Sequence, residues 1–149
     1  MLKLIVGVKG SGKTKALVDD LNAMAQQGDH NVVCIERGRR LDRFVKYHIR
    51  LIDINEYPVT GFDQLLGFIA GINAKDYDLT HLYIDSIFKV TNTETNYVDL
   101  AAFCEELDHF AIDKQFEATI ILSEDPDSLP EPLQRFIHFE DESESEADE

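Results

Sequence analysis

The chain has 149 residues, of which 44% are hydrophobic and 29% charged, the balance of one ordinary globular domain with a single core. Its formal net charge is −15, which argues against nucleic acid as a partner, because a nucleic-acid coat needs a net positive surface. The charge is split along the chain, since residues 1–50 hold ten of the 14 cations and residues 51–149 hold 24 of the 29 acids.

The predicted elements alternate between strands and helices in chain order. Five apolar runs predict short strands, at 2–8, 31–36, 51–54, 80–85 and 118–123. Helical periodicity predicts three longer helices between them, over 13–27, 60–72 and 97–113. Near the C-terminus, a capping box predicts one further turn of helix and an apolar run predicts an edge strand, at 128–131 and 136–139. This alternation predicts an α/β fold of three layers, with helices on both faces of a mostly parallel sheet.

Domain organisation and location follow from composition. Residues 1–139 are expected to form one domain, whereas residues 140–149 hold seven acids and almost no apolar side chain and are expected to be a disordered acidic tail. The N-terminus is too short in apolar residues for a signal peptide, and no later run approaches the ~18 residues of a membrane span. The two cysteines offer neither a disulfide framework nor a zinc motif. We therefore expect a cytoplasmic protein without a membrane partner.

The clearest motif is Gly7-Val-Lys-Gly-Ser-Gly-Lys-Thr14, which matches G-x-x-x-x-G-K-[ST] in full. Its glycines let backbone N–H groups turn inward around phosphates, and the helix that follows directs its positive dipole end to the same anion. Lys13 would supply charge to the β- and γ-phosphate oxygens, and Thr14 would offer a hydroxyl to Mg²⁺. The predicted nucleotide-binding residues form one run: Gly7, Val8, Lys9, Gly10, Ser11, Gly12, Lys13, Thr14 and Lys15.

With this motif placed between a strand and a helix, most of residues 1–123 resemble the P-loop NTPase superfamily. The resemblance is closest to small bacterial ATP-binding P-loop proteins, some of them labelled twitching-motility ATPases, although the acidic and histidine motifs of motility ATPases are missing. The layout between residues 31 and 85 is similar to the RecA-like branch and to the thymidine kinases. The resemblance implies a three-layer P-loop fold with about five strands, and Mg²⁺ and ATP as cofactors; GTP fits less well, because no N-K-x-D motif is present.

The resemblance also implies a strand that ends in a magnesium-associated aspartate, which Leu82-Tyr-Ile-Asp85 supplies. Asp85 is expected to hold Mg²⁺ through a water, together with Thr14. Hydrolysing ATPases of the superfamily usually carry glutamate beside this aspartate to polarise the attacking water, but the neighbour here is Ser86. Because a missing general base removes a factor of about 10²–10⁴ in rate, hydrolysis by the chain alone is expected to be slow.

Other candidate residues lie at strand ends and in the basic connector after the second strand. Glu36 and Asp53 could act as paired carboxylates on a substrate hydroxyl, and Ser123 could sense the γ-phosphate, since each ends a predicted strand. The connector could form a lid over the nucleotide, clamp a phosphate, bind an acidic partner or the acidic tail, or be an ordinary solvated loop. Its candidate lid residues are Arg37, Arg39, Arg40 and Arg43.

Three functions are open from the sequence. The leading one is Mg·ATP binding with slow or partner-dependent hydrolysis, in a nucleotide-gated regulator or adaptor that works with a protein partner. The alternative is a small-molecule phosphotransferase similar to nucleoside kinases, although the Asp-Glu pair and the zinc-bound lid of thymidine kinases are missing. The third is an interaction module that does not need nucleotide, against which the intact Lys13-Thr14 pair argues.

Overall fold

The computed structural model describes residues 1–45, 48–75 and 78–138. Its elements are β1 (Leu2–Gly7), α1 (Lys13–Ala25), β2 (Val32–Glu36), β3 (Arg50–Asp53), η1 (Ile54–Glu56), α2 (Gly61–Lys75), β4 (His81–Asp85), α3 (Ile87–Thr91), α4 (Tyr97–Lys114), β5 (Glu117–Ser123), η2 (Pro126–Ser128) and α5 (Glu131–Gln134). None of the helices in these stretches is long and apolar enough to cross a membrane. The predicted disordered tail, 140–149, lies outside the described residues.

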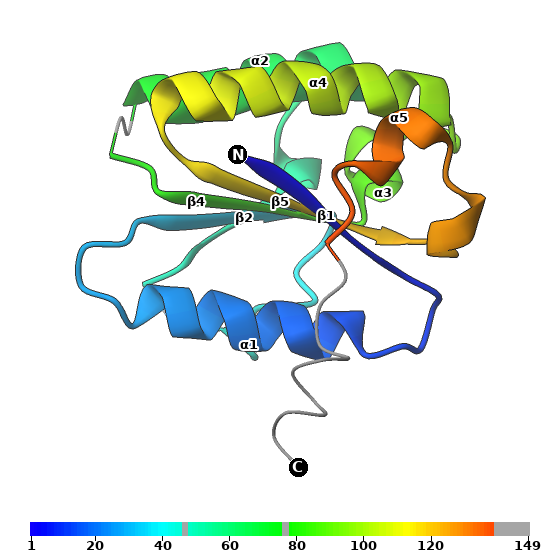
Figure 1. The fold of residues 1–149 in the computed structure, drawn as a ribbon. Coiled ribbons are helices and arrows are strands. Elements are labelled where there is room, and N and C mark those ends of the chain that lie inside the picture. Colours follow the sequence, from blue (N-terminus) through cyan, green and yellow to red (C-terminus); the bar gives the residue numbers. More distant parts are fainter. Residues whose placement is uncertain (46–47, 76–77, 139–149) are drawn as a thin grey trace.

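Five parallel strands form one sheet in the order β1-β5-β4-β2-β3. Helix α1 lies on one face of the sheet, and α2 and α4 lie on the other, which gives three layers (Figure 1). These findings confirm the predicted α/β class and the parallel sheet of five strands. Because all strands run the same way, their carboxyl ends meet at one edge, where open α/β sheets bind ligands.

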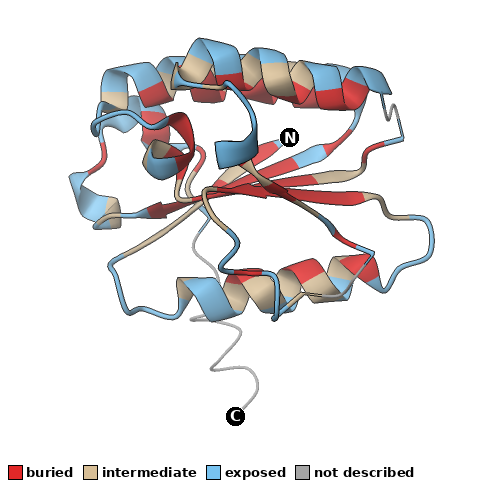
Figure 2. Ribbon diagram, turned by 180° about the vertical axis from the view of Figure 1, so that it is seen from behind, coloured by how far each residue is buried: buried red, intermediate tan, exposed pale blue. Residues whose placement is uncertain are grey.

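The sheet is buried between its two helical layers (Figure 2). Every residue of β2, the charged Glu36 included, is buried, as expected for a strand covered on both faces. Helix α4 directs Leu100, Phe103 and Leu107 into the larger core cluster, at the spacing of one helical face. Burying an apolar side chain of this size contributes about 1.5–3 kcal/mol to the stability of the fold. The packed core therefore holds the strand ends in fixed positions.

The last described segment of the chain covers the outer edge of β1. The Leu4 N–H donates to the Phe136 carbonyl at 2.7 Å, and the His138 N–H donates to the Leu4 carbonyl at 2.8 Å. Leu4 and Ile137 form a parallel bridge. The predicted edge strand is therefore present as a single bridge, with Phe139 outside the described residues, and it satisfies backbone groups that a free edge would leave open.

Candidate functional site

The carboxyl edge of the sheet brings many of the predicted site residues together around one cavity. This cavity has a volume of about 680 Å³ and lies between the loop after β1 and the turn after β4. The predicted residues among those that line it are Lys9, Gly10, Gly12, Lys13, Thr14, Arg40, Asp85 and Ser123. We call it the edge cavity.

The glycine-rich loop, residues 7–14, has a backbone that requires its glycines. Gly10 and Gly12 have φ angles of +88° and +90°, in the left-handed region that side chains with a Cβ rarely adopt. A Cβ at Gly7 would lie 2.7 Å from Ser11 Oγ, so a larger residue there would displace the Ser11 side chain. Helix α1 begins at Lys13 without a side-chain cap, and the positive end of its dipole therefore faces the loop.

Lys13 and Ser123 lie beside this loop. Lys13 Nζ donates to the Val8 carbonyl across the loop at 3.0 Å. Partial burial lowers the pKa of Lys13, while the negative charge of Asp85 raises it. Ser123 ends β5 and pairs in register with Gly7. An anion bound in the loop would offer the Lys13 ammonium a stronger partner than a neutral carbonyl.

Asp85 ends β4 and is only 4% exposed. Its Oδ2 atom accepts a hydrogen bond from Arg40 Nη2 at 2.9 Å, and the Ser86 hydroxyl donates to Oδ1 at 3.4 Å. Arg40 belongs to the turns that follow β2, so this ion pair links the connector to the end of β4, 45 residues further along the chain. The guanidinium balances the charge of a carboxylate that would otherwise be costly to bury.

Glu36 ends β2, the strand beside β4, and is 2% exposed. Its Oε2 atom accepts a hydrogen bond from the Leu41 N–H at 3.2 Å, whereas Oε1 has no hydrogen-bond partner among the described residues. Burial raises the pKa of Glu36 and the nearby charge of Asp85 adds to the rise, while the Leu41 N–H and Arg40 oppose it. A buried carboxyl group with a raised pKa beside a second carboxylate is typical of groups that exchange protons.

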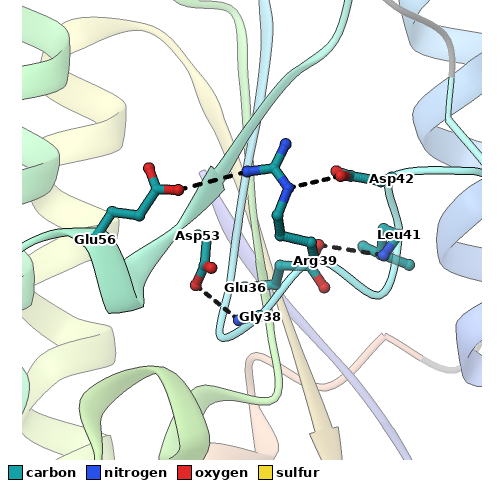
Figure 3. Close-up of polar contacts among 7 residues, drawn as sticks. All are labelled: Glu36, Gly38, Arg39, Leu41, Asp42, Asp53 and Glu56. Carbon is teal, nitrogen blue, oxygen red and sulfur yellow. Dashed lines mark hydrogen bonds and ion pairs between the residues drawn. The ribbon is translucent and has the colours of Figure 1, made fainter.

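Asp53 has a different environment from Glu36, although the two pair in register on β2 and β3. Its Oδ1 atom accepts a hydrogen bond from the backbone N–H of Gly38 at 2.7 Å (Figure 3) and another from the backbone N–H of Asn55 at 3.0 Å. These bonds lower the pKa of Asp53. Neither Glu36 nor Asp53 is among the described residues that line the edge cavity. Asp53 holds the turn after β2, and a joint action of the two carboxylates stays a prediction.

The four connector arginines have four different environments. Arg40 lines the edge cavity, whereas Arg39 donates to Asp42 at 2.6 Å and lies 3.7 Å from Glu56 (Figure 3). The Arg43 guanidinium lies over the ring of the next residue in the chain, 5.0 Å from its centre. Arg37 contacts α3 and η1 rather than the cavity. A second cavity of about 470 Å³ is lined by residues 39–44 and shares Thr14 and Arg40 with the first.

Two parts of the site could not be predicted from the sequence. The far wall of the edge cavity comes from α3 and the loop after it, through Phe88, Lys89 and Thr95. Helix α3 has five residues, which is too short for an apolar period to indicate it. The turn before it contains Ser86 with φ +63°, a left-handed conformation for a residue with a Cβ.

The left-handed turn at Ser86 leads to a stability prediction. We expect Ser86→Gly to unfold with a free energy about 1 kcal/mol higher than Ser86→Ala, because only glycine avoids the Cβ clash in this region. The Ser86 N–H donates to the Ile121 carbonyl at 3.1 Å, which keeps the turn in place in both variants. Urea unfolding of the two proteins measures the difference. Equal stabilities would show that this backbone carries no strain.

No protein-family model matches the chain, and comparison with the curated proteins gives no match either. The structure itself defines the class as an α/β protein with one five-stranded parallel sheet. At the carboxyl edge of this sheet, a glycine-rich loop, a half-buried lysine and a buried aspartate line a common cavity.

Proposed function

We propose that this chain is a P-loop protein that binds Mg·ATP and hydrolyses it slowly or with a partner, as a nucleotide-gated regulator or adaptor. The observation that carries the proposal is the meeting of the glycine-rich loop, Lys13 and Asp85 at the edge cavity. They come from β1, α1 and β4, and β5 lies between the two strands. The loop supplies backbone N–H groups for phosphates, Lys13 supplies charge, and Asp85 supplies a carboxylate for a metal.

The residues of the edge cavity fit Mg²⁺ that arrives with a nucleotide. Thr14 and Asp85 both line the cavity and offer oxygen donors, which Mg²⁺ prefers. Within the described residues, no group of three or more His, Cys, Asp and Glu side chains could hold a metal ion alone. Mg²⁺ is usually held through one or two carboxylates, waters and substrate phosphates, so Thr14 and Asp85 suffice. When bound, the ion would neutralise charge on the β- and γ-phosphates.

Arg40 supports the gating part of the proposal. A magnesium-bound water can reach Asp85 Oδ2 only if that atom gives up or shares its ion pair with Arg40. A released guanidinium can turn either to the phosphates or to the second cavity, whose lining also includes Arg40. Nucleotide binding would therefore change the surface of the connector, and a protein partner could recognise that change.

Glu36 supports slow hydrolysis. No carboxylate follows Asp85 directly, but Glu36 brings one to the end of the neighbouring strand. It could accept a proton from an attacking water once it is deprotonated and has access to the edge cavity. In the present structure the Leu41 N–H holds it at 3.2 Å, and burial raises its pKa. A partner or a nucleotide that moves the connector would release this base.

The small-molecule phosphotransferase remains the second candidate, because the edge cavity extends past the glycine-rich loop to Phe88 and Thr95. An acceptor would bind in this extension, beside a triphosphate in the loop. A screen of nucleosides and small phosphorylated metabolites with labelled ATP tests it. A labelled product would favour the kinase, whereas ATP binding without any product would favour the regulator.

Arg40→Ala tests the proposed gate. We expect the variant to bind Mg·ATP about tenfold more tightly than the wild type, because Mg²⁺ no longer competes with an ion pair at Asp85. The ligand-free variant should also melt at a lower temperature, since a buried carboxylate loses its partner. Isothermal titration calorimetry and thermal unfolding measure the two effects.

Arg43→Ala is the matched control for the gate. It removes the same charge from the same connector, but its guanidinium lies over the Phe44 ring rather than on Asp85. Its affinity for Mg·ATP should stay within about twofold of the wild-type value, since surface charges contribute little. Equal changes in both variants, or weaker binding by Arg40→Ala, would contradict the gate. The latter result would make Arg40 a phosphate clamp.

A further inference from the structure

Arg37 directly follows Glu36, and its guanidinium joins three separate segments. It donates to the main-chain carbonyls of Lys89 and Val90, the latter at 3.3 Å, and to Asn55 Oδ1. The end of β2 is thereby tied to α3 and to η1. Hydrogen bonds from a charged donor are roughly twice as strong as neutral ones, so this contact is a firm attachment.

Helix α3 needs such an attachment. It has only five residues, and left-handed residues stand at both of its ends, Ser86 with φ +63° and Asn92 with φ +58°. A helix of one turn is not stable by itself in water. Ile87 and Val90 fix one side of α3 in the core. Arg37 holds its last turn through the carbonyls of Lys89 and Val90, of which the Lys89 carbonyl also accepts from the Asn92 N–H at 3.1 Å.

The position of α3 decides the shape of the edge cavity. Phe88 and Lys89 form the part of its wall beyond Asp85, and Ser86 lies between Asp85 and this wall. A shift of α3 would therefore move Phe88 and Lys89 and change the shape of the cavity. Arg37 itself is not among the described residues that line the cavity.

We propose that Arg37 is a positioning residue for the nucleotide reaction. It fixes α3, and with it Ser86 and the far wall of the edge cavity, relative to the strand end that carries Glu36. The inference rests on the proposed function and extends it, because it assigns to Arg37 a role distinct from that of a lid or phosphate clamp. Arg37 acts through α3 and touches neither the nucleotide nor the reacting atoms.

The test compares Arg37→Ala with the wild type in two independent readouts. Amide hydrogen exchange of residues 87–92 in the ligand-free variant should be about tenfold faster, whereas exchange in α4 and β5 should be unchanged. Affinity for Mg·ATP should change less than about threefold, while single-turnover hydrolysis should slow by at least about tenfold. Added guanidinium ion should partly restore the hydrolysis rate, because it can occupy the vacated site.

Arg135→Ala is the matched control, since Arg135 is an exposed arginine that pairs with Glu105 and is not among the described residues that line either cavity. It should leave exchange in residues 87–92 and turnover near wild-type values. Arg37→Lys, which keeps the charge but not the forked donor, should give an intermediate exchange rate at α3. This second variant provides the same readout if the alanine variant does not fold.

Each outcome decides the inference. Unchanged exchange at α3 in Arg37→Ala overturns it, and so does faster exchange at α3 with unchanged turnover. Faster exchange throughout the protein, with lost nucleotide affinity, shows a general structural role and also overturns it. If the wild type binds Mg·ATP without turning it over, the proposed slow hydrolysis fails separately. In that case, Mg·ATP must slow exchange at α3 in the wild type but not in Arg37→Ala for the inference to hold.

Discussion

Replacing Lys13 with alanine is expected to abolish the binding of Mg·ATP while leaving the protein folded. The Lys13 ammonium lies beside the glycine-rich loop, where it donates to the Val8 carbonyl at 3.0 Å. With a Kd of about 10 μM, about 1 mM Mg·ATP would stabilise the wild type by roughly 2.7 kcal/mol. For a domain of this size the melting temperature would rise by about 5–10 °C. The variant should show no rise in thermal unfolding experiments.

Lys15→Ala is the control for this experiment. Lys15 ends the predicted nucleotide-binding run, but it is not among the described residues that line the edge cavity, and its side chain is 82% exposed and pairs with Asp19 on the surface of α1. Its replacement removes the same charge without reaching the interior of the loop, so most of the thermal shift should remain. A full shift in Lys13→Ala would contradict the proposed phosphate site. A wild type that responds to neither Mg·ATP nor Mg·GTP would favour the interaction module that needs no nucleotide.

The position of the glycine-rich loop follows from local sequence. An apolar run, two glycines that need left-handed backbone and a helical period after Lys13 each specify their own segment, and the structure contains all three. Helix α1 ends at Ala25, two residues before the predicted end. Local patterns predict such elements well because strand and helix periods reflect which side chains each element buries.

The strand order, in contrast, is not contained in local patterns. β5 lies between β1 and β4, so Ser123 pairs in register with Gly7. Which strands become neighbours depends on how the helices pack on the two faces of the sheet. The sequence places Thr14 and Asp85 at the same edge, but only the fold shows that one cavity includes both.

The contacts of single polar side chains could not be predicted from the sequence either. The connector arginines look equivalent in sequence, yet Arg40 bonds to Asp85 and Arg37 to main-chain carbonyls of α3. The predicted cap of the last helix is wrong: the Ser128 hydroxyl donates to the Asp125 carbonyl, and α5 begins after Pro130 without a side-chain cap. Such choices depend on which acceptor the tertiary structure brings within reach.

Two adjacent connector residues hold the two buried carboxylates of the site. Arg40 bonds to Asp85 through its side chain, and Leu41 bonds to Glu36 through its backbone N–H. Leu41 is itself buried against α1 in the smaller core cluster. A movement that frees Asp85 for Mg²⁺ therefore acts on the segment that also restrains Glu36. Metal binding and base release would then be coupled, which explains how hydrolysis could be slow until the connector moves.

Glu36→Gln is expected to make the protein more stable. The wild-type carboxyl group is buried, and its Oε1 atom has no partner among the described residues. Glutamine keeps an oxygen for the Leu41 N–H and removes the buried charge, which should raise the free energy of unfolding by about 1 kcal/mol. Urea unfolding as a function of pH separates this effect from general changes in packing.

The pH dependence of this stability has a defined sign. Because the folded-state pKa of Glu36 is raised above its ordinary value of 4.5, its contribution to stability is full below pH 4.5 and is lost as the pH rises through the raised pKa. Glu36→Gln should lack this loss. Asp53→Asn is the matched control with the opposite sign, since the lowered pKa of Asp53 gives stability that disappears as the pH falls through it.

Once the connector has moved and released Glu36, the same Glu36→Gln variant should hydrolyse Mg·ATP more slowly than the wild type by a factor of about 10²–10⁴, while it binds Mg·ATP as the wild type does. Wild-type turnover should rise with pH through the raised pKa of Glu36, because only the carboxylate can accept a proton from water. A single-turnover assay with labelled ATP measures both effects. Unchanged turnover in Glu36→Gln would exclude Glu36 as the base. A loss of turnover together with a gain in stability would show that the carboxyl group is retained for chemistry at the expense of the fold.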